Sequence, residues 1–431
     1  MRPYEVLFWA SIYATAGIFV AGIGATALQT VFLMTCAVCL AAYLRDRKRA
    51  LTASAALILI PLIGAGFFYV HFHAALTKPL APPPDSLATA CIVFLPERRE
   101  KSASLRAELY PPYRGEYRLL VPPHAPYGYG DLLSITVERS LGSRGDLLVV
   151  AEAERVGDCG NPIRRVLLTF RARAVETLGK ILPGEKAALA AGFLVGDESG
   201  FSDGLRADVR ETGTAHIVAL SGQNILYVVR LVYILAGWCL AWRQRFWATA
   251  GAVLLFVGVT GGEASVVRAA IMGLISLTAP QIGRRYAAGV AIAAAAGVMS
   301  IADPTLPAGD LGFQLSFAAL IGIMVLKPRL ESRLGWSGEP GFAGWRDILL
   351  MTTSAQVAVL PVLLLAAREV SWYGIIPNLL IVPVVGYATI LSGVAALLGT
   401  LSDSLGLVAS IPLHLLLGYA LGVIAFFARA L

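Results

Sequence analysis

The sequence predicts a polytopic α-helical membrane protein with a small β-domain inserted on the outer side of the membrane. The chain of 431 residues is 57% hydrophobic and 15% charged, and its mean hydropathy is +0.70. Soluble domains carry about 25% charged residues. So few charges cannot cover a soluble surface of this size, and lipid must cover much of it. Long apolar stretches on both sides of one polar, proline-rich stretch place the β-domain as an insertion.

The apolar part divides into segments of roughly spanning length. The stretch from Val6 to Leu44 holds no charge and has room for two spans, so it is not a short secretory signal. Several segments hold only about 15–17 residues, near the spanning minimum, and we expect about 10–11 segments, some of them half-helices. The apolar segments are 6–22, 27–44, 51–72, 214–240, 246–260, 265–281, 287–301, 310–326, 349–367, 374–400 and 406–428.

Lysine and arginine in the short loops predict the orientation. They follow the second, fourth, sixth and eighth segments, which all end on one side if the segments alternate, and the positive-inside rule makes that side the cytoplasm. We therefore expect a cytoplasmic N-terminus, with residues 73–213 and the C-terminus outside. The basic residues in these loops are Arg45, Arg47, Lys48, Arg49, Arg243, Arg245, Arg284, Arg285, Lys327, Arg329 and Arg333.

The polar stretch 79–178 has the pattern of a small β-domain. Five short alternating runs are separated by turn signals, which favours a barrel or sandwich, with an OB-type barrel as the expected form. Cys91 and Cys159 lie near its two ends, and an even number of cysteines in an oxidising compartment predicts a disulfide. The alternative is two separate thiols. The runs are 89–95, 104–109, 116–121, 132–138 and 145–151.

The stretch 167–212 is amphipathic and predicts helices that lie at the membrane interface or cap the bundle. The expected organisation is therefore four parts. They are N-terminal transmembrane helices at 1–75, the exterior OB-like domain at 79–178, interfacial helices at 179–212 and a transmembrane channel domain at 213–431.

Polar residues at the start of the fourth apolar segment are the first candidate site. They are His216, Ser221, Gln223, Asn224 and Arg230. The spacing of His216, Gln223 and Arg230 puts them near one face if the helix is continuous, while Ser221 and the glycine after it are able to interrupt it. Polar groups are costly against lipid, so this face should meet protein or a wet cavity. The alternative is a structural stripe that hydrogen-bonds neighbouring helices.

Further candidates are Arg268, Asp310, Gln314 and Asn378. Arg268 follows Glu263, which would neutralise it in the structural alternative, and Asp310 is alternatively a helix cap. Asn378 lies between two prolines that predict a break or kink in the helix, a recurrent feature of transport sites. We expect one polar cavity inside the bundle to unite six of the candidates, namely His216, Gln223, Arg230, Arg268, Gln314 and Asn378.

The sequence predicts no cofactor, no metal site and no enzymatic activity. It has no Walker A sequence and no HExxH motif. A hydrolase built on Ser221 and His216 is disfavoured, because residues five apart point to different faces of a helix.

Four runs of residues, in order along the chain, resemble motifs of the ComEC family of DNA-uptake proteins. They are 191–197 with 213–222, then 267–272, then 307–317, and last 355–361 with 377–383. Gly130 and Asp131, before an expected strand, are similar to a fragment of the family's exterior domain. The chain departs from the family at Asn224, where a histidine or similar residue is frequent. It also lacks the HxHxDH metal cluster of the nuclease domain that many members carry, so we expect it not to cut DNA.

The resemblance implies a channel in the bacterial inner membrane that passes single-stranded DNA into the cytoplasm. The path would be formed by the candidate residues above. The implied partners, besides single-stranded DNA and the lipid bilayer, are an external DNA receptor, a separate nuclease and a cytoplasmic motor. The alternative is a secondary transporter for an ion or small solute with an exterior accessory domain, in which the same charged residues would hold substrate and coupling ions.

Overall fold

The computed structural model describes residues 82–430, apart from 84, 95, 99–101, 114, 124, 142–146, 219–221, 282, 284, 304–305, 337–343 and 367–373. The three predicted spans before residue 75 lie outside the described residues. The chain forms two compact units. One contains residues 264–375, and the other contains residues 78–263 and 376–431.

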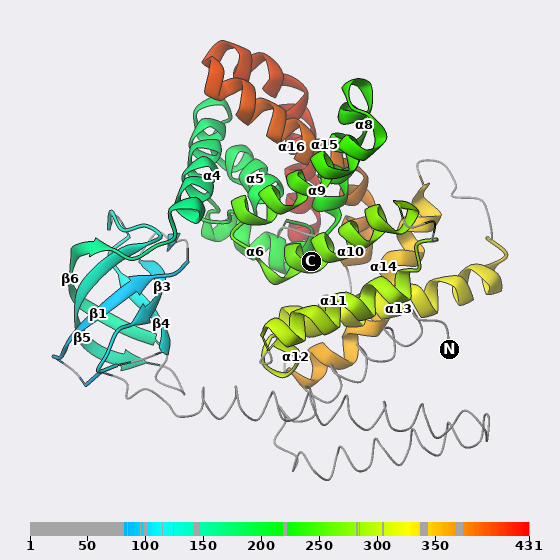
Figure 1. Cartoon of the computed structure of the whole chain (residues 1–431). Coiled ribbons are helices and arrows are strands. Elements are labelled where there is room, and N and C mark those ends of the chain that lie inside the picture. Colours follow the sequence, from blue (N-terminus) through cyan, green and yellow to red (C-terminus); the bar gives the residue numbers. More distant parts are fainter. Residues whose placement is uncertain are drawn as a thin grey trace, which may run out of the picture. The chain divides into compact units, whose positions relative to one another are not determined.

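Strands of the β-domain form one small mixed sheet (Figure 1). Its order is β1-β5-β6-β4-β3-β2, and β1 also pairs with β3. All pairs are antiparallel except β4 with β6. The bounds are β1 Leu87–Ile92, β2 Glu97–Arg98, β3 Ala103–Leu109, β4 Gly115–Val121, β5 Asp131–Leu141 and β6 Leu147–Asp158.

The period-two pattern of these strands explains their burial. In β3, Leu105, Ala107 and Leu109 are buried, while Arg106 and Glu108 point away from the core. Each of the five predicted runs overlaps a strand, and among the described residues only the two-residue β2 was missed. The structure therefore confirms a small β-sheet, and the OB-type barrel stays a prediction.

Three helices follow the sheet. They are α4 Pro162–Ile181, α5 Gly184–Val195 and α6 Asp203–Glu211. Asn161 begins α4 as its N-cap, accepting a hydrogen bond from the Ile163 amide, and proline follows at the first helical position. The amphipathic stretch was predicted to lie at the membrane interface or to cap the bundle, and α5 within it is buried over most of its length. Its alanines and Phe193 pack into the largest core cluster with residues of α15 and α16.

The remaining helices of this unit are α7 Ala215–Val218, α8 Gly222–Cys239, α9 Trp242–Val259, α15 Ile375–Leu401 and α16 Asp403–Ala430. The predicted apolar segment 214–240 is divided between α7 and α8. The predicted break or kink at Asn378 is not a break, because α15 runs through both prolines. Pro377 lies in the first turn, where a helix does not need the missing amide proton.

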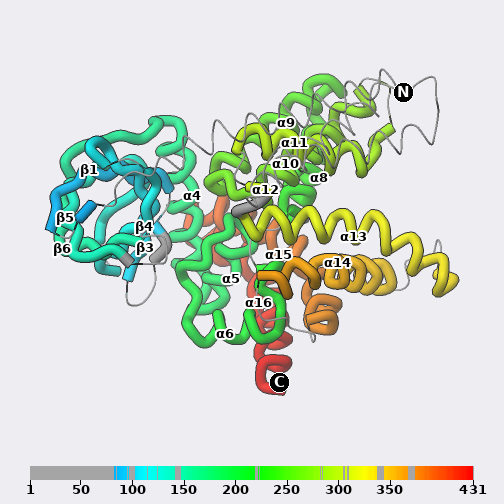
Figure 2. Tube along the Cα trace, turned by 90° about the horizontal axis from the view of Figure 1, so that it is seen from below, coloured from blue at the N-terminus to red at the C-terminus, as the bar shows by residue number. Residues whose placement is uncertain are grey.

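The other unit is helical. It contains α10 Ala264–Gln281, α11 Ala288–Ala302, α12 Leu306–Gly309, α13 Leu311–Leu334 and α14 Trp345–Leu365. Helices α13 and α14 run side by side (Figure 2). A smaller core forms between α11 and α13 around Met299, Phe313 and Phe317.

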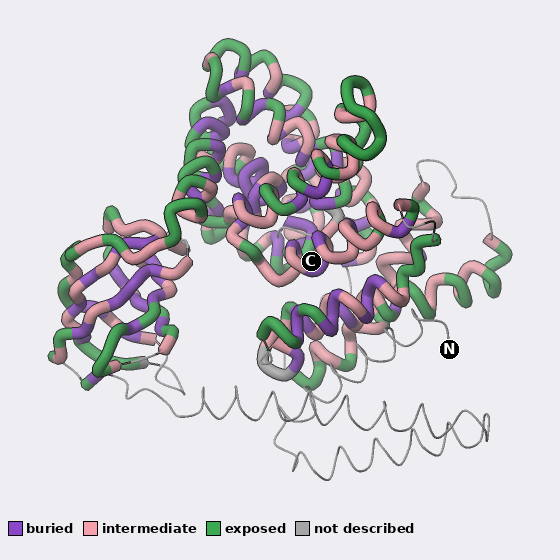
Figure 3. The backbone as a smooth tube through the Cα atoms, in the orientation of Figure 1, coloured by how far each residue is buried: buried purple, intermediate pink, exposed green. Residues whose placement is uncertain are grey.

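Five of the described helices are long and apolar enough to cross a membrane, namely α10, α13, α14, α15 and α16. Much of their surface is exposed in the chain (Figure 3). Such length and composition favour the predicted polytopic membrane protein.

Candidate functional site

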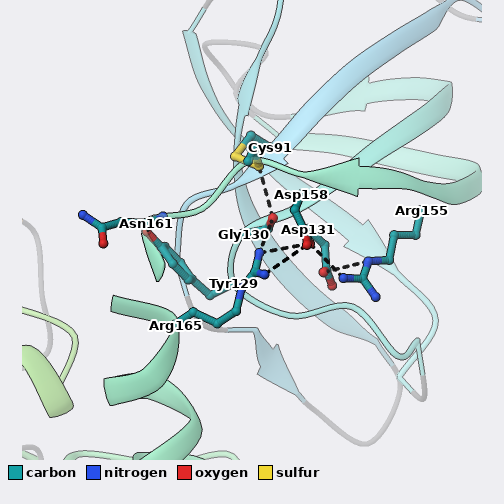
Figure 4. The surroundings of a disulfide bond; sticks show 9 residues. Cys91, Tyr129, Gly130, Asp131, Arg155, Asp158, Asn161 and Arg165 are labelled. Carbon is teal, nitrogen blue, oxygen red and sulfur yellow. Dashed lines mark hydrogen bonds and ion pairs between the residues drawn. A yellow bond between two sulfur atoms is a disulfide. The ribbon is translucent and has the colours of Figure 1, made fainter. Parts of the chain in front are cut away.

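A disulfide ties β1 to the end of the sheet. Cys91 in β1 is bonded to Cys159, which follows β6, with Cα atoms 6.0 Å apart. The predicted pair is therefore confirmed. The backbone amide of Cys159 donates to the carbonyl oxygen of Gly130 at 2.8 Å, so the bond lies directly beside the Gly130-Asp131 fragment (Figure 4).

Charged side chains link the same fragment to α4. Asp158 accepts hydrogen bonds from Arg155 at 2.8 Å and from Arg165 at 3.0 Å. Arg165 also donates to the carbonyl oxygen of Gly130 at 3.1 Å, and Asp131 pairs with Arg155 at 3.0 Å. The hydrogen bonds from Arg165 and then Arg155 lower the pKa of Asp158 below its ordinary value. The strand ends and the first turn of α4 thus form one ionic network.

Gly130 is required by this geometry. Its φ is +81°, and a Cβ there would lie 2.8 Å from both the Arg165 guanidinium and the Cα of Gly160. A side chain would therefore be strained and would separate the sheet from α4.

Arg268 is the most deeply buried cation among the sequence candidates. It lies on α10 with 6% of its surface exposed, and its guanidinium lies 5.4 Å from the Phe317 ring centroid on α13. Among the described residues, its Nη1 has no hydrogen-bond partner. Asp310 attracts it electrostatically. A buried guanidinium with a donor left over has the chemistry to bind an anion.

Asp310 and Gln314 organise the start of α13 beside this arginine. Asp310 is the N-cap of α13 and accepts a hydrogen bond from the Phe313 amide. The alternative role predicted for Asp310, a helix cap, is therefore confirmed. Gln314 donates to the carbonyl oxygen of Pro307 at 3.0 Å. The structure therefore gathers Arg268, Asp310 and Gln314 around the α12–α13 corner.

In the other unit, a hydrogen bond from Asn224 joins α8 to a carbonyl oxygen of α5. Its Nδ2 donates to the Phe193 oxygen at 2.8 Å, and the Thr389 hydroxyl reaches the same oxygen at 3.5 Å. Phe193, Asn224 and Thr389 are all buried. Nearby, Tyr227 packs so closely on Gly386 that a Cβ there would lie 2.4 Å from its ring. Asn224 therefore has the structural role that the sequence left open as an alternative, because it hydrogen-bonds a neighbouring helix.

The other candidates of this unit lie in different surroundings. Asn378 is buried with 2% exposed, and its Oδ1 has no partner among the described residues. His216 is exposed and contacts the Gly213 carbonyl at 3.0 Å. Arg230 is also exposed. Ser221 and the side chain of Gln223 lie outside the described part.

The predicted shared cavity stays a prediction. Arg268 and Gln314 belong to one unit, while His216, Arg230 and Asn378 belong to the other. One open hollow between α15 and α16 is apolar and contains none of these residues. It is lined by Leu380, Tyr419, Gly422, Val423, Phe426 and Phe427.

Arg171 was missed as a functional candidate. It is 8% exposed on α4 and donates to the carbonyl oxygen of Thr260, the C-cap of α9, at 2.9 Å. Burial lowers the pKa of Arg171, and the carboxylates of Asp197 and Glu263 oppose that shift. Its position in the sequence could have indicated its burial, because Arg171 lies on the same helical face as the buried Leu168 and Ala174.

Most of these polar residues lie in a stretch that matches a known family. A family model described as Competence protein matches residues 193–431, which is more than half of the chain. The chain belongs to the Competence protein family. The resemblance read from the motifs is thereby confirmed. The match begins at Phe193, whose carbonyl holds Asn224, and it includes the Arg268 cluster.

A curated relative agrees with this assignment. The chain is similar to ComE operon protein 3 of Bacillus subtilis (strain 168), with 24% identity over 258 residues. The aligned part covers 58% of this chain and 32% of the relative. The chain therefore spans about a third of that protein. No solved structure matches it.

Proposed function

We propose that this chain is the channel part of a DNA-uptake system and passes single-stranded DNA through the inner membrane into the cytoplasm. Membership of the Competence protein family indicates a role in DNA uptake during transformation. The five apolar helices support a membrane location. The exterior β-domain, the external receptor, the separate nuclease and the cytoplasmic motor belong to the same proposal.

The buried guanidinium of Arg268 carries the proposal. A cation inside an apolar bundle is costly, and such groups usually mark a pathway or a partner. Nη1 has no partner among the described residues, and Phe317 offers a ring beside it. A phosphodiester supplies the missing acceptor, and nucleobases stack on aromatic rings and arginine planes. Arg268 with Phe317 thus has the chemistry that a passing single strand needs.

The β-domain is proposed to be an OB-type domain that meets DNA first. The supporting observations are that β1 pairs with both β5 and β3, and that β4 and β6 are parallel. Domains of this type bind oligonucleotides on their strands and loops. The confirmed disulfide fits an oxidising exterior compartment.

Transformation of cells that carry Arg268→Ala tests the proposal. We expect the frequency to fall at least about tenfold, because one charge-assisted contact is worth about 1.5–3 kcal/mol. Arg268→Lys should restore part of it by keeping the charge without the planar fork. Arg173→Ala, at an exposed arginine of α4, is the matched control. Membrane abundance and melting temperature of each variant separate lost transport from lost folding.

A folded Arg268→Ala variant that transforms at the wild-type frequency would overturn the proposal. Transport of an ion or small solute by reconstituted protein, independent of DNA and lost in Arg268→Ala, would favour the transporter alternative instead.

A further inference from the structure

Two aromatic rings and two arginines form an alternating stack where the sheet meets α4. The Arg106 guanidinium on β3 lies 5.0 Å from the ring centroid of Phe94, in the connection between β1 and β2. Arg164, in the first turn of α4, lies 5.9 Å from the same ring centroid. It also lies 4.9 Å from the ring centroid of Tyr129, in the connection between β4 and β5. Four separate parts of the chain therefore contribute to one stack.

Arg164 differs from its neighbour in how its charge is used. Arg165 pairs with Asp158 at 3.0 Å and donates to the carbonyl oxygen of Gly130. Arg164 makes no ion pair within the described part of the chain, and its guanidinium contacts two rings instead. A guanidinium carries five N–H donors in one plane, and a ring beside that plane leaves the donors at its edge accessible to a ligand. Arg164 therefore presents a planar cation that is suited to a phosphate.

A pair of like charges lies on the outer face of the sheet beside the stack. Arg106 is directly opposite Arg118 in the antiparallel β3–β4 pair. Like charges directly opposite one another destabilise a sheet, and a bound anion removes that penalty. The next pair on the same face is Glu108 with Glu116, so negative charge bounds the cationic area toward the β3–β4 turn. An anion is therefore favoured on the side of the stack.

Both rings are held in place by the fold. The Tyr129 hydroxyl accepts a hydrogen bond from the Asn161 amide at 3.3 Å (Figure 4), and a Cβ on Gly160 would lie 3.0 Å from the Tyr129 ring. Phe94 contacts the loop that follows α9, since a Cβ on Gly261 would lie 3.6 Å from the Phe94 ring. A preorganised surface loses little conformational entropy when a ligand binds. The stack is such a surface, and it lies beside the end of α9.

We propose that this stack is a binding site for single-stranded DNA. Unpaired bases stack on Phe94 and Tyr129. Backbone phosphates lie on Arg106, Arg118 and Arg164. Single-strand binders combine aromatic platforms with cations along the backbone, and they tolerate any sequence because every base has a face that stacks. A duplex is disfavoured, since its bases must first leave their partners. An acidic protein segment would also meet the arginines, but it makes no use of the two rings.

The proposal rests on the proposed function, in which the chain handles single-stranded DNA, and it assigns the first contact to particular residues. All five of these residues precede residue 193, so the family match does not cover them. The site is formed by the sheet together with α4, and it does not require the sheet to be a barrel.

Oligonucleotide binding by the full chain in detergent tests the site without transport, so its result is separate from that of the Arg268 uptake assay. The probe is labelled oligothymidylate of about 12 nucleotides, within the range that single-strand-binding folds cover. Phe94→Leu should weaken binding at least about fivefold, which corresponds to the loss of one stacked base. Phe94→Tyr keeps a ring and should bind like the wild type. Tyr110→Leu, at a 45% exposed tyrosine outside the stack, is the matched control.

Salt titration separates the arginines from the rings. Arg164→Ala should reduce the slope of log affinity against log salt by about 0.7, the value for one phosphate contact on a single strand. Phe94→Leu should lower the affinity and leave the slope unchanged. Arg173→Ala, at an exposed arginine of α4, is the control and should change neither quantity. The melting temperature of each variant shows that it is folded.

Two further probes show whether bases are bound. A strand of abasic sites keeps the phosphates and loses the bases, so it should bind the wild type at least as weakly as oligothymidylate binds Phe94→Leu. The matching duplex should also bind more weakly than the single strand. Equal binding of abasic and normal strands, or unchanged binding by folded Phe94→Leu, would overturn the site and favour an acidic partner. A wild-type chain that binds no oligothymidylate would overturn it too, while the channel proposal would still depend on the result with Arg268→Ala.

Discussion

Backbone carbonyl oxygens accept hydrogen bonds from several buried or half-buried polar side chains of this protein. Arg171 donates to Thr260, Asn224 to Phe193 and Gln314 to Pro307. In each case the carbonyl lies at or near a helix end or in a short helix, where it is free to accept a side-chain donor. Small polar side chains that reach another helix are a common way to join helices in membranes. The first role of these residues is therefore to join helices by hydrogen bonds.

Asn224→Ala tests the tie at Phe193. The substitution removes the 2.8 Å hydrogen bond to the Phe193 oxygen and leaves that oxygen with the Thr389 hydroxyl at 3.5 Å. We expect the free energy of unfolding to fall by about 1–3 kcal/mol, the cost of an unmet buried group. Denaturant unfolding in detergent measures it. Thr389→Val is the matched control and should cost less, because that hydroxyl bonds mainly to Val385 at 2.9 Å. Equal losses in the two variants would contradict the assignment.

At the scale of elements, helix α13 contacts α14 through a glycine. A Cβ on Gly322 would lie 2.3 Å from the Ala358 Cβ and 2.6 Å from the Ser354 carbonyl oxygen. Backbone cannot yield as a flexible side chain does, so this glycine sets how closely the two helices approach. Close approach at small residues is how helices pack where lipid is the solvent.

Gly322→Ala should separate these helices. We expect a loss of about 1–3 kcal/mol or more, as for overpacked cores. Thermal unfolding in detergent is the measurement. Gly422→Ala is the control, since a Cβ there meets nothing within 4 Å, and it should be neutral or slightly stabilising. A stable Gly322→Ala variant would show that α13 and α14 are free to shift apart.

The junction of β6 with α4 should respond to acid. Arg165 and Arg155 lower the folded-state pKa of Asp158. A carboxyl with a lowered folded pKa contributes stability above its unfolded pKa and loses it as pH falls through the folded value. The melting temperature of the wild type should therefore exceed that of Asp158→Asn at neutral pH. The two should converge below the folded-state pKa. A constant difference across that range would exclude the carboxylate as its source.

The sequence predicted elements better than contacts. The apolar segments after residue 245 each match a helix, because length and hydropathy are local properties. The hydrogen bonds between helices were not predictable from local sequence. Arg171 donates to an acceptor 89 positions away, and Asn224 donates to one 31 positions away. Of the predicted break or kink, the break does not occur at Pro377, because this residue lies in the first turn of α15 and that position depends on where the helix begins. Among the nine site candidates, the structure brings Arg268, Asp310 and Gln314 together.

For the whole molecule, the arrangement of charges predicts the orientation that the proposed DNA uptake requires. Under that proposal the β-domain faces the source of DNA, and the positive-inside rule places the basic loops in the cytoplasm. Val156 in β6 is 63% exposed, and Cys239 at the end of α8 is an exposed free thiol. The predicted orientation places these two positions on opposite sides of the membrane, while the disulfide keeps Cys91 and Cys159 unreactive.

Labelling of intact cells with a membrane-impermeant maleimide checks this orientation. In a chain with Cys36→Ser and Cys39→Ser, Val156→Cys should react before permeabilisation and Cys239 only afterwards. Cys239→Ser in the same chain shows which signal belongs to the connection between α8 and α9. Reaction of Cys239 in intact cells, with Val156→Cys protected, would invert the topology. It would then place the β-domain in the cytoplasm, where it has no incoming strand to receive.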